Sequence, residues 1–141
     1  MPSVVNNNPK PLEQWIYFVD RSLPKGSLLQ ALKENGRVAK HHDELFSQDA
    51  SDVVWLTEAG KNNWIVLSHD RAIARKPLEI ESLRRAKVRA FMPAAKGNLK
   101  GQEITEIIIN ALPAIEEFSQ KNVPPFIAKI YRDGTLIKWR I

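Results

Sequence analysis

The sequence contains no cysteine among its 141 residues. This absence excludes disulfide bonds, thiolate catalysis and cysteine-based zinc sites, and it suits a reducing compartment. Long apolar runs are also lacking, so no segment predicts a membrane span, and residues 1–10 hold no apolar core of the kind that a secretory signal needs. We therefore expect a cytoplasmic protein with no membrane association.

Enough apolar residues are present to build one hydrophobic core. They make up 43% of the chain, which is of a length typical of a single domain. Residues 1–12 are polar and rich in proline and asparagine, which predicts a flexible N-terminal tail and leaves residues 13–141 as the domain. All four tryptophans stand in apolar patterns and are expected in the core: Trp15, Trp55, Trp64 and Trp139.

The charges are distributed unevenly along the chain. The formal net charge of +5 weakly favours an anionic partner. Residues 71–100 contain nine lysines and arginines against two glutamates, whereas residues 41–52 contain four acids and no lysine or arginine. A nuclease needs both groups, because carboxylates bind metal ions and cations bind phosphate. A solvated basic helix face explains the basic stretch equally well.

The apolar pattern predicts strands that alternate with helices. Ser22 is expected to cap the first helix, Val54 to face inward from the second, and Pro113 to bend the last. The turn sequence at 132–134 predicts a C-terminal β-hairpin. Alternating elements require crossover connections, so we expect an α/β fold with a mainly parallel sheet. The expected strands are 15–19, 38–42, 64–68, 88–92, 126–130 and 135–139, and the expected helices are 23–35, 49–62, 77–87 and 104–120.

Three acids are expected to meet at one edge of this sheet. Asp20 and Asp70 each follow a buried strand, and Asp52 lies in the first turn of the helix that leads into the second of these strands. Ligands of parallel sheets bind beyond the carboxyl ends of the strands. Taken singly, each acid is better explained as a helix cap or turn residue. Together they repel one another unless a cation intervenes, which predicts a Mg²⁺ or Mn²⁺ site.

The motifs around these acids resemble those of the PIN-like superfamily. Residues 18–24 read Phe-Val-Asp-Arg-Ser-Leu-Pro and residues 67–70 read Leu-Ser-His-Asp. The pattern is most similar to the compact VapC-type toxin branch and covers about residues 14–93. The resemblance implies a three-layer PIN-like domain in which Asp20, Asp52 and Asp70 are catalytic and bind metal. The remaining acid of the family maps onto Asp43 or Glu44, and the sequence leaves that choice open.

Within this alternative, Glu44 is the candidate for catalysis and Asp43 the candidate for metal binding. The resemblance implies an endoribonuclease that uses Mg²⁺ or Mn²⁺ for hydrolysis of RNA, and a toxin whose partner is a small antitoxin protein. A homodimer is an open alternative for its assembly. The rival hypothesis is a non-catalytic PIN-like module that binds RNA or protein, but three mutually repelling acids favour the enzyme. The expected RNA-binding residues are Arg71, Arg75, Arg84, Arg85 and Lys87.

Overall fold

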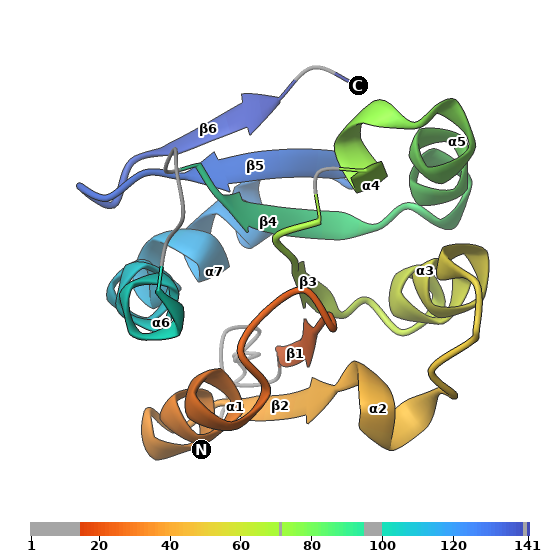
Figure 1. Cartoon of the computed structure of the whole chain (residues 1–141). Coiled ribbons are helices and arrows are strands. Elements are labelled where there is room, and N and C mark those ends of the chain that lie inside the picture. Colours follow the sequence, from red (N-terminus) through yellow and green to blue (C-terminus); the bar gives the residue numbers. More distant parts are fainter. Residues whose placement is uncertain (1–14, 71, 95–99, 140) are drawn as a thin grey trace, which may run out of the picture.

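A six-stranded sheet forms the centre of the computed structural model, with the strand order β2-β1-β3-β4-β5-β6 (Figure 1). The structure describes residues 15–70, 72–94, 100–139 and 141, so the tail expected at 1–12 lies outside the described residues. The strands are β1 (Ile16–Val19), β2 (Val38–His41), β3 (Ile65–Leu67), β4 (Arg89–Pro93), β5 (Phe126–Ile130) and β6 (Leu136–Trp139). The helices are α1 (Lys25–Glu34), α2 (His42–Leu45), α3 (Asp52–Lys61), α4 (Ala72–Arg75), α5 (Pro77–Ala86), α6 (Gly101–Asn110) and α7 (Leu112–Lys121).

The predicted mainly parallel sheet and the C-terminal hairpin are confirmed. Strands β2, β1, β3, β4 and β5 pair in parallel, whereas β6 runs antiparallel to β5 at the edge of the sheet. The hairpin turn uses Gly134 at a φ of +89°, a conformation that favours glycine. Asp133 stabilises the same turn, because its carboxylate accepts the Thr135 N–H at 2.9 Å.

Side chains of alternate sheet residues pack into two separate hydrophobic clusters. On one face, Tyr17 and Val19 belong to a cluster that the buried residues of α1, α6 and α7 complete. On the other face, Phe18 and Val66 pack with Trp55 and other residues of α3, α4 and α5. This alternation is what the two-residue period of a strand requires. The protein is therefore a three-layer α/β domain with helices on both faces of the sheet (Figure 1).

The expectation about the last helix is wrong. Residues 104–120 do not form one bent helix, because α6 and α7 meet at Ala111. Pro113 occupies the second position of α7, where a missing backbone N–H removes no hydrogen bond of that helix. The four-residue helices α2 and α4 were not predicted, since an apolar period cannot be recognised over a single turn.

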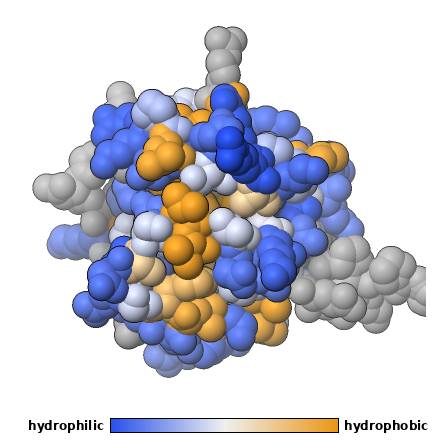
Figure 2. Space-filling view, turned by 90° about the vertical axis from the view of Figure 1, so that its right-hand side faces the viewer, coloured by the Kyte–Doolittle hydropathy of each residue, from blue (hydrophilic) through white to orange (hydrophobic). Residues whose placement is uncertain are grey.

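Val54 does not face inward, because its side chain is 47% exposed. The buried side of α3 is formed by Trp55, Leu56 and Ala59, and this stripe turns Val54 outward. Figure 2 views the side of the molecule that carries α2, α3 and α5, and it shows apolar residues among hydrophilic ones. The exposed apolar residues of α2 and α3 are Leu45, Val53 and Val54.

A partly buried ion pair attaches α7 to the sheet. Glu116 of α7 is only 3% exposed, and its Oε2 accepts the Tyr17 hydroxyl at 2.6 Å. Arg37, which precedes β2, donates from Nε and Nη2 to the two carboxylate oxygens at 2.9 and 2.7 Å. This bidentate geometry is the strongest form of such a pair. Burial, followed by the hydrogen bond to Glu116, raises the pKa of Tyr17 far above its ordinary value.

The raised pKa of Tyr17 predicts that the protein loses stability in alkali. Tyrosine ionises near pH 10 in the unfolded chain, so the contribution of Tyr17 is complete below about pH 10 and declines above it. Relative to Tyr17→Phe, the wild type should lose about 1.4 kcal/mol of unfolding free energy per pH unit above that point. Urea denaturation of both proteins between about pH 8 and pH 11 measures this difference. Tyr131→Phe, at the other tyrosine, is the matched control, and parallel curves for wild type and Tyr17→Phe would contradict the prediction.

Candidate functional site

Asp20 lies directly after β1, at the edge where the parallel strands end, which we call the carboxyl edge. Its backbone N–H donates to the Leu67 carbonyl at 3.0 Å and so continues the pairing with β3. Its side chain is 5% exposed, and Oδ2 accepts the hydroxyl groups of Ser22 at 2.8 Å and Ser68 at 2.9 Å. Two hydroxyls from different segments therefore hold this carboxylate in one orientation.

The prediction that Ser22 caps the first helix is wrong. Pro24 occupies the N-cap position of α1, and no side chain caps that helix. The chain turns tightly after β1, with the Leu23 N–H donating to the Asp20 carbonyl at 3.1 Å. This turn brings the Ser22 hydroxyl to Asp20, and the same hydroxyl accepts the backbone N–H of His69 at 2.8 Å. Ser22 thus joins the β1–α1 loop to the segment that follows β3.

Ser68 connects Asp20 to Asp70. Ser68 is fully buried, and its hydroxyl accepts the Asp70 backbone N–H at 3.0 Å while donating to Asp20. Because β1 and β3 pair in parallel, with Val19 beside Leu67, both acids follow their strands at the carboxyl edge. The Asp70 side chain is partly exposed. Ser22 and Ser68 were not among the expected site residues, although each stands close to an acid in the sequence.

Asp52 begins α3, with Ser51 as the N-cap residue. Its Oδ1 accepts the indole N–H of Trp55 at 2.9 Å, one turn further along the same helix. Trp55 is fully buried against Phe18, so this hydrogen bond satisfies a polar atom at the rim of the core. Asp52 therefore has a structural role on α3, and its catalytic role stays a prediction.

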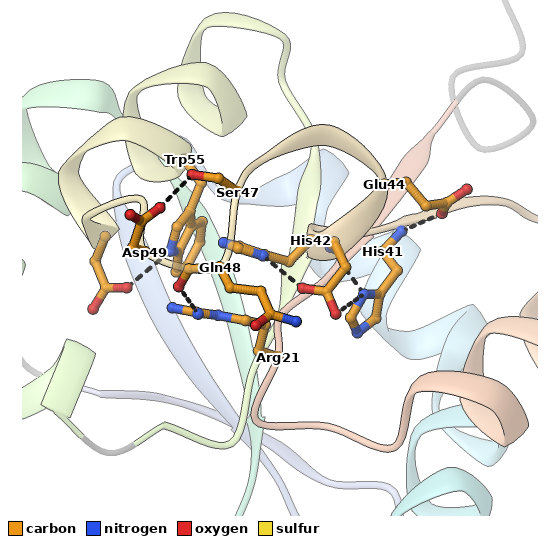
Figure 3. A network of polar contacts seen from close by, with 10 residues as sticks. Arg21, His41, His42, Glu44, Ser47, Gln48, Asp49 and Trp55 are labelled. Atoms are coloured by element: carbon orange, nitrogen blue, oxygen red, sulfur yellow. Dashed lines mark hydrogen bonds and ion pairs between the residues drawn. The ribbon is translucent and has the colours of Figure 1, made fainter.

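Asp43 and Glu44 both take part in the local structure of α2, and Figure 3 shows Glu44 beside His41. The Glu44 carboxylate accepts the His41 backbone N–H at 2.7 Å, while the His41 ring accepts the Asp43 N–H at 3.0 Å, which makes a capping box. Asp43 also contacts the ring of His42 at 3.1 Å. His41 and His42 are buried at the end of β2. The predicted roles of Asp43 and Glu44 in catalysis and metal binding remain predictions.

Arg21 places a cation immediately after Asp20. Its guanidinium donates to the backbone carbonyl of Gln48, in the loop between α2 and α3 (Figure 3). In the same loop, the Ser47 hydroxyl donates to Asp49 at 2.8 Å. Arg21 therefore attaches the loop that leads to Asp52 to the loop that follows β1.

The fit of the carboxyl edge to a metal ion is incomplete. The side chains hydrogen-bonded around Asp20 offer only oxygen atoms, which are the donors that Mg²⁺ and Mn²⁺ prefer. However, across residues 15–70, 72–94, 100–139 and 141, no three histidine, aspartate or glutamate side chains form a group that could hold a metal ion. The donor chemistry suits a hard ion, whereas the predicted set of three acids is not assembled as such a group.

The basic residues of α5 lie away from Asp20. Helix α5 ends at Ala86, and only two residues separate it from the start of the parallel strand β4, so its last turn lies at the amino ends of the strands. Arg84, Arg85 and Lys87 are exposed there. Arg75, at the end of α4, is exposed beside the carboxyl edge, and Arg71 lies outside the described residues. The RNA-binding role of all five residues remains a prediction.

Comparison with protein families gives a match that spans the first four strands. A family model described as a PIN-like domain matches residues 16–95, which is more than half of the chain and includes Asp20, Asp52 and Asp70. The chain belongs to the PIN-like domain family. PIN-like domains are commonly nucleases, and the three-layer fold described above is consistent with this family. Comparisons with curated proteins and with solved structures found no match.

None of the helices in the described part of this PIN-like domain combines the length and apolar character needed to cross a membrane. The matched region ends just after β4, so the hairpin of β5 and β6 lies beyond it.

Proposed function

We propose that this PIN-like domain is an endoribonuclease that hydrolyses RNA phosphodiester bonds with Mg²⁺ or Mn²⁺. The observation that carries the proposal is the buried carboxylate of Asp20, which Ser22 and Ser68 orient at the carboxyl edge. The backbone N–H of Asp70 donates to the same Ser68 hydroxyl. Buried acids at this edge of a parallel sheet are typical of a ligand site. The family adds support, since its members are commonly nucleases.

In this proposal Asp20 and Asp70 hold the metal ion, and Asp52 is the third acid. The ion would polarise the scissile phosphate and supply hydroxide from water. Ser22 and Ser68 orient Asp20 by their hydrogen bonds, a supporting role that commonly determines how well a metal ligand functions. Arg75, exposed beside the carboxyl edge, contributes positive charge for the RNA backbone.

The cellular role that we propose is that of a VapC-type toxin restrained by a small antitoxin. This proposal rests on the motifs around Asp20 and Asp70 and on family membership. Co-purification with the product of the neighbouring open reading frame tests it. A stable complex with a small protein that suppresses cleavage is the expected result, whereas a partner that leaves cleavage unchanged contradicts the toxin role.

A non-catalytic PIN-like module that binds RNA or protein is the second candidate function. It is favoured by the structural engagement of Asp43 and Glu44 and by the absence of a three-acid group in the described residues. The enzyme and the binding module can be distinguished by incubating the protein with single-stranded RNA under three conditions. These are added Mn²⁺, added Mg²⁺ and an added chelator. If the protein is the enzyme, RNA is cleaved with at least one of the two ions and is not cleaved with the chelator. Binding of RNA without cleavage under all three conditions favours the module.

A further inference from the structure

A pocket of about 280 Å³ lies beside the candidate site. Met92, Pro93 and Ala94, at the end of β4, form its apolar part. His69 lines another wall, and the backbone N–H of this residue donates to Ser22, which in turn donates to Asp20. The pocket and the Asp20 carboxylate are therefore connected through one short chain segment and one serine.

The charged residues that line this pocket favour an anion. Arg75 and Lys129 carry positive charge, His69 is the third polar residue, and the described lining includes no aspartate or glutamate. The Lys129 ammonium lies 4.0 Å from the centre of the Trp139 ring, a cation–π contact that holds the ammonium in place. Trp139 packs partly against the second hydrophobic cluster and is partly exposed, so its expected core position is only partly correct.

Cations beside an exposed aromatic ring are the usual means by which proteins bind single-stranded nucleic acid. The cations bind phosphate, and the ring offers a flat surface to a base. A volume of about 280 Å³ is near the lower limit for small-ligand sites, which fits a single nucleotide better than a larger ligand. Arg84 and Arg85, in contrast, lie in the last turn of α5, at the amino ends of the strands and so away from this pocket.

We infer that this pocket binds one nucleotide of an RNA strand, next to the phosphodiester presented to Asp20. Arg75 and Lys129 contact its phosphate, and the part of the Trp139 side chain that Lys129 and the core leave exposed contacts its base. The inference rests on the proposed function for the identity of the ligand as RNA, and it adds the subsite that positions the strand. Neither Lys129 nor Trp139 belongs to the region that the family model matches.

Binding of a fluorescently labelled single-stranded RNA, measured by anisotropy in a chelator at several salt concentrations, tests this inference without any cleavage. The double variant Arg75→Gln/Lys129→Gln should bind at least about tenfold more weakly, and its salt slope should fall by about 0.7, the amount expected for one neutralised phosphate. Trp139→Leu should weaken binding about tenfold with a smaller change in the salt slope than in the double variant, because it removes an aromatic contact with the base and no charge.

Two further double variants each remove two positive charges outside the pocket. Lys33→Gln/Lys121→Gln alters exposed lysines of α1 and α7, on the opposite face of the sheet, and should keep affinity within about twofold of the wild type. Arg84→Gln/Arg85→Gln tests the basic turn of α5. Thermal unfolding confirms that each variant is folded, and if Trp139→Leu fails to fold, the Arg75/Lys129 variant alone decides the inference.

The outcomes separate this inference from the proposed function. Equal binding by the Arg75/Lys129 and Lys33/Lys121 variants would overturn the pocket, even if the protein cleaves RNA. A larger loss in the α5 variant than in the pocket variant, or no RNA binding by the wild type, would also overturn it. RNA binding that depends on Arg75 and Lys129 but is never followed by cleavage would support the pocket and reject the nuclease.

Discussion

Replacing Asp20 by asparagine is expected to lower RNA cleavage at least about a hundredfold while the protein stays folded. The change removes one charge from the proposed metal site, and a metal ion contributes several kcal/mol to such a reaction, with about 1.4 kcal/mol for each factor of ten. The fold should tolerate the change, because an asparagine oxygen still accepts the hydroxyls of Ser22 and Ser68. Asp70→Asn is expected to have the same effect on cleavage.

Cleavage of a labelled RNA with Mn²⁺ or Mg²⁺, together with urea denaturation, measures both halves of this prediction. Asp49→Asn is the matched control, because it makes the same chemical change at an exposed loop acid that accepts the Ser47 hydroxyl at 2.8 Å. The control should retain full activity. Wild-type rates in Asp20→Asn would exclude a metal site at this position, whereas an unfolded variant would direct the test to Asp70→Asn, whose side chain is partly exposed.

Replacing Gly60 by alanine is expected to destabilise the protein by about 3 kcal/mol or more. Gly60 lies in α3, where this helix crosses the end of α5. A Cβ atom on Gly60 would stand 1.8 Å from the Ala86 carbonyl oxygen and 2.6 Å from its carbon. Both contacts involve backbone, so no side chain can move aside and the two helices must separate. This cost exceeds the gain of up to about 1 kcal/mol that alanine normally brings to a helix.

Gly26→Ala is the matched control for this substitution. Gly26 is an exposed residue in the first turn of α1, and a Cβ there would meet nothing within 4 Å. Its replacement should leave stability unchanged or raise it by up to about 1 kcal/mol. Urea denaturation of both variants shows whether each substitution lowers or raises the free energy of unfolding. Equal stability of Gly60→Ala and the wild type would mean that α3 and α5 are further apart than the structure indicates.

The sequence by itself determined the architecture of this protein. Apolar runs and their periods predicted all six strands and the α/β class, and the motifs near Asp20 and Asp70 indicated the PIN-like family. These features could be predicted because a buried strand needs a short apolar run and an amphipathic helix needs a 3.6-residue period, and both are local properties of the chain. The parallel direction of β1 and β3 then follows from the crossover that joins them.

Only the tertiary structure decided which polar groups meet. Ser22 could cap α1 or bind Asp20, and the choice depended on His69, which β3 brings to it from 47 residues away. Likewise, Asp52 accepts a hydrogen bond from Trp55 and Glu44 accepts one at the cap of α2, and composition does not reveal either contact. Lys129 and Trp139 meet because β5 and β6 pair in one register. Hydrogen bonds and cation–π contacts depend on orientation and distances of a few ångströms, so they form only where packing places the two partners together.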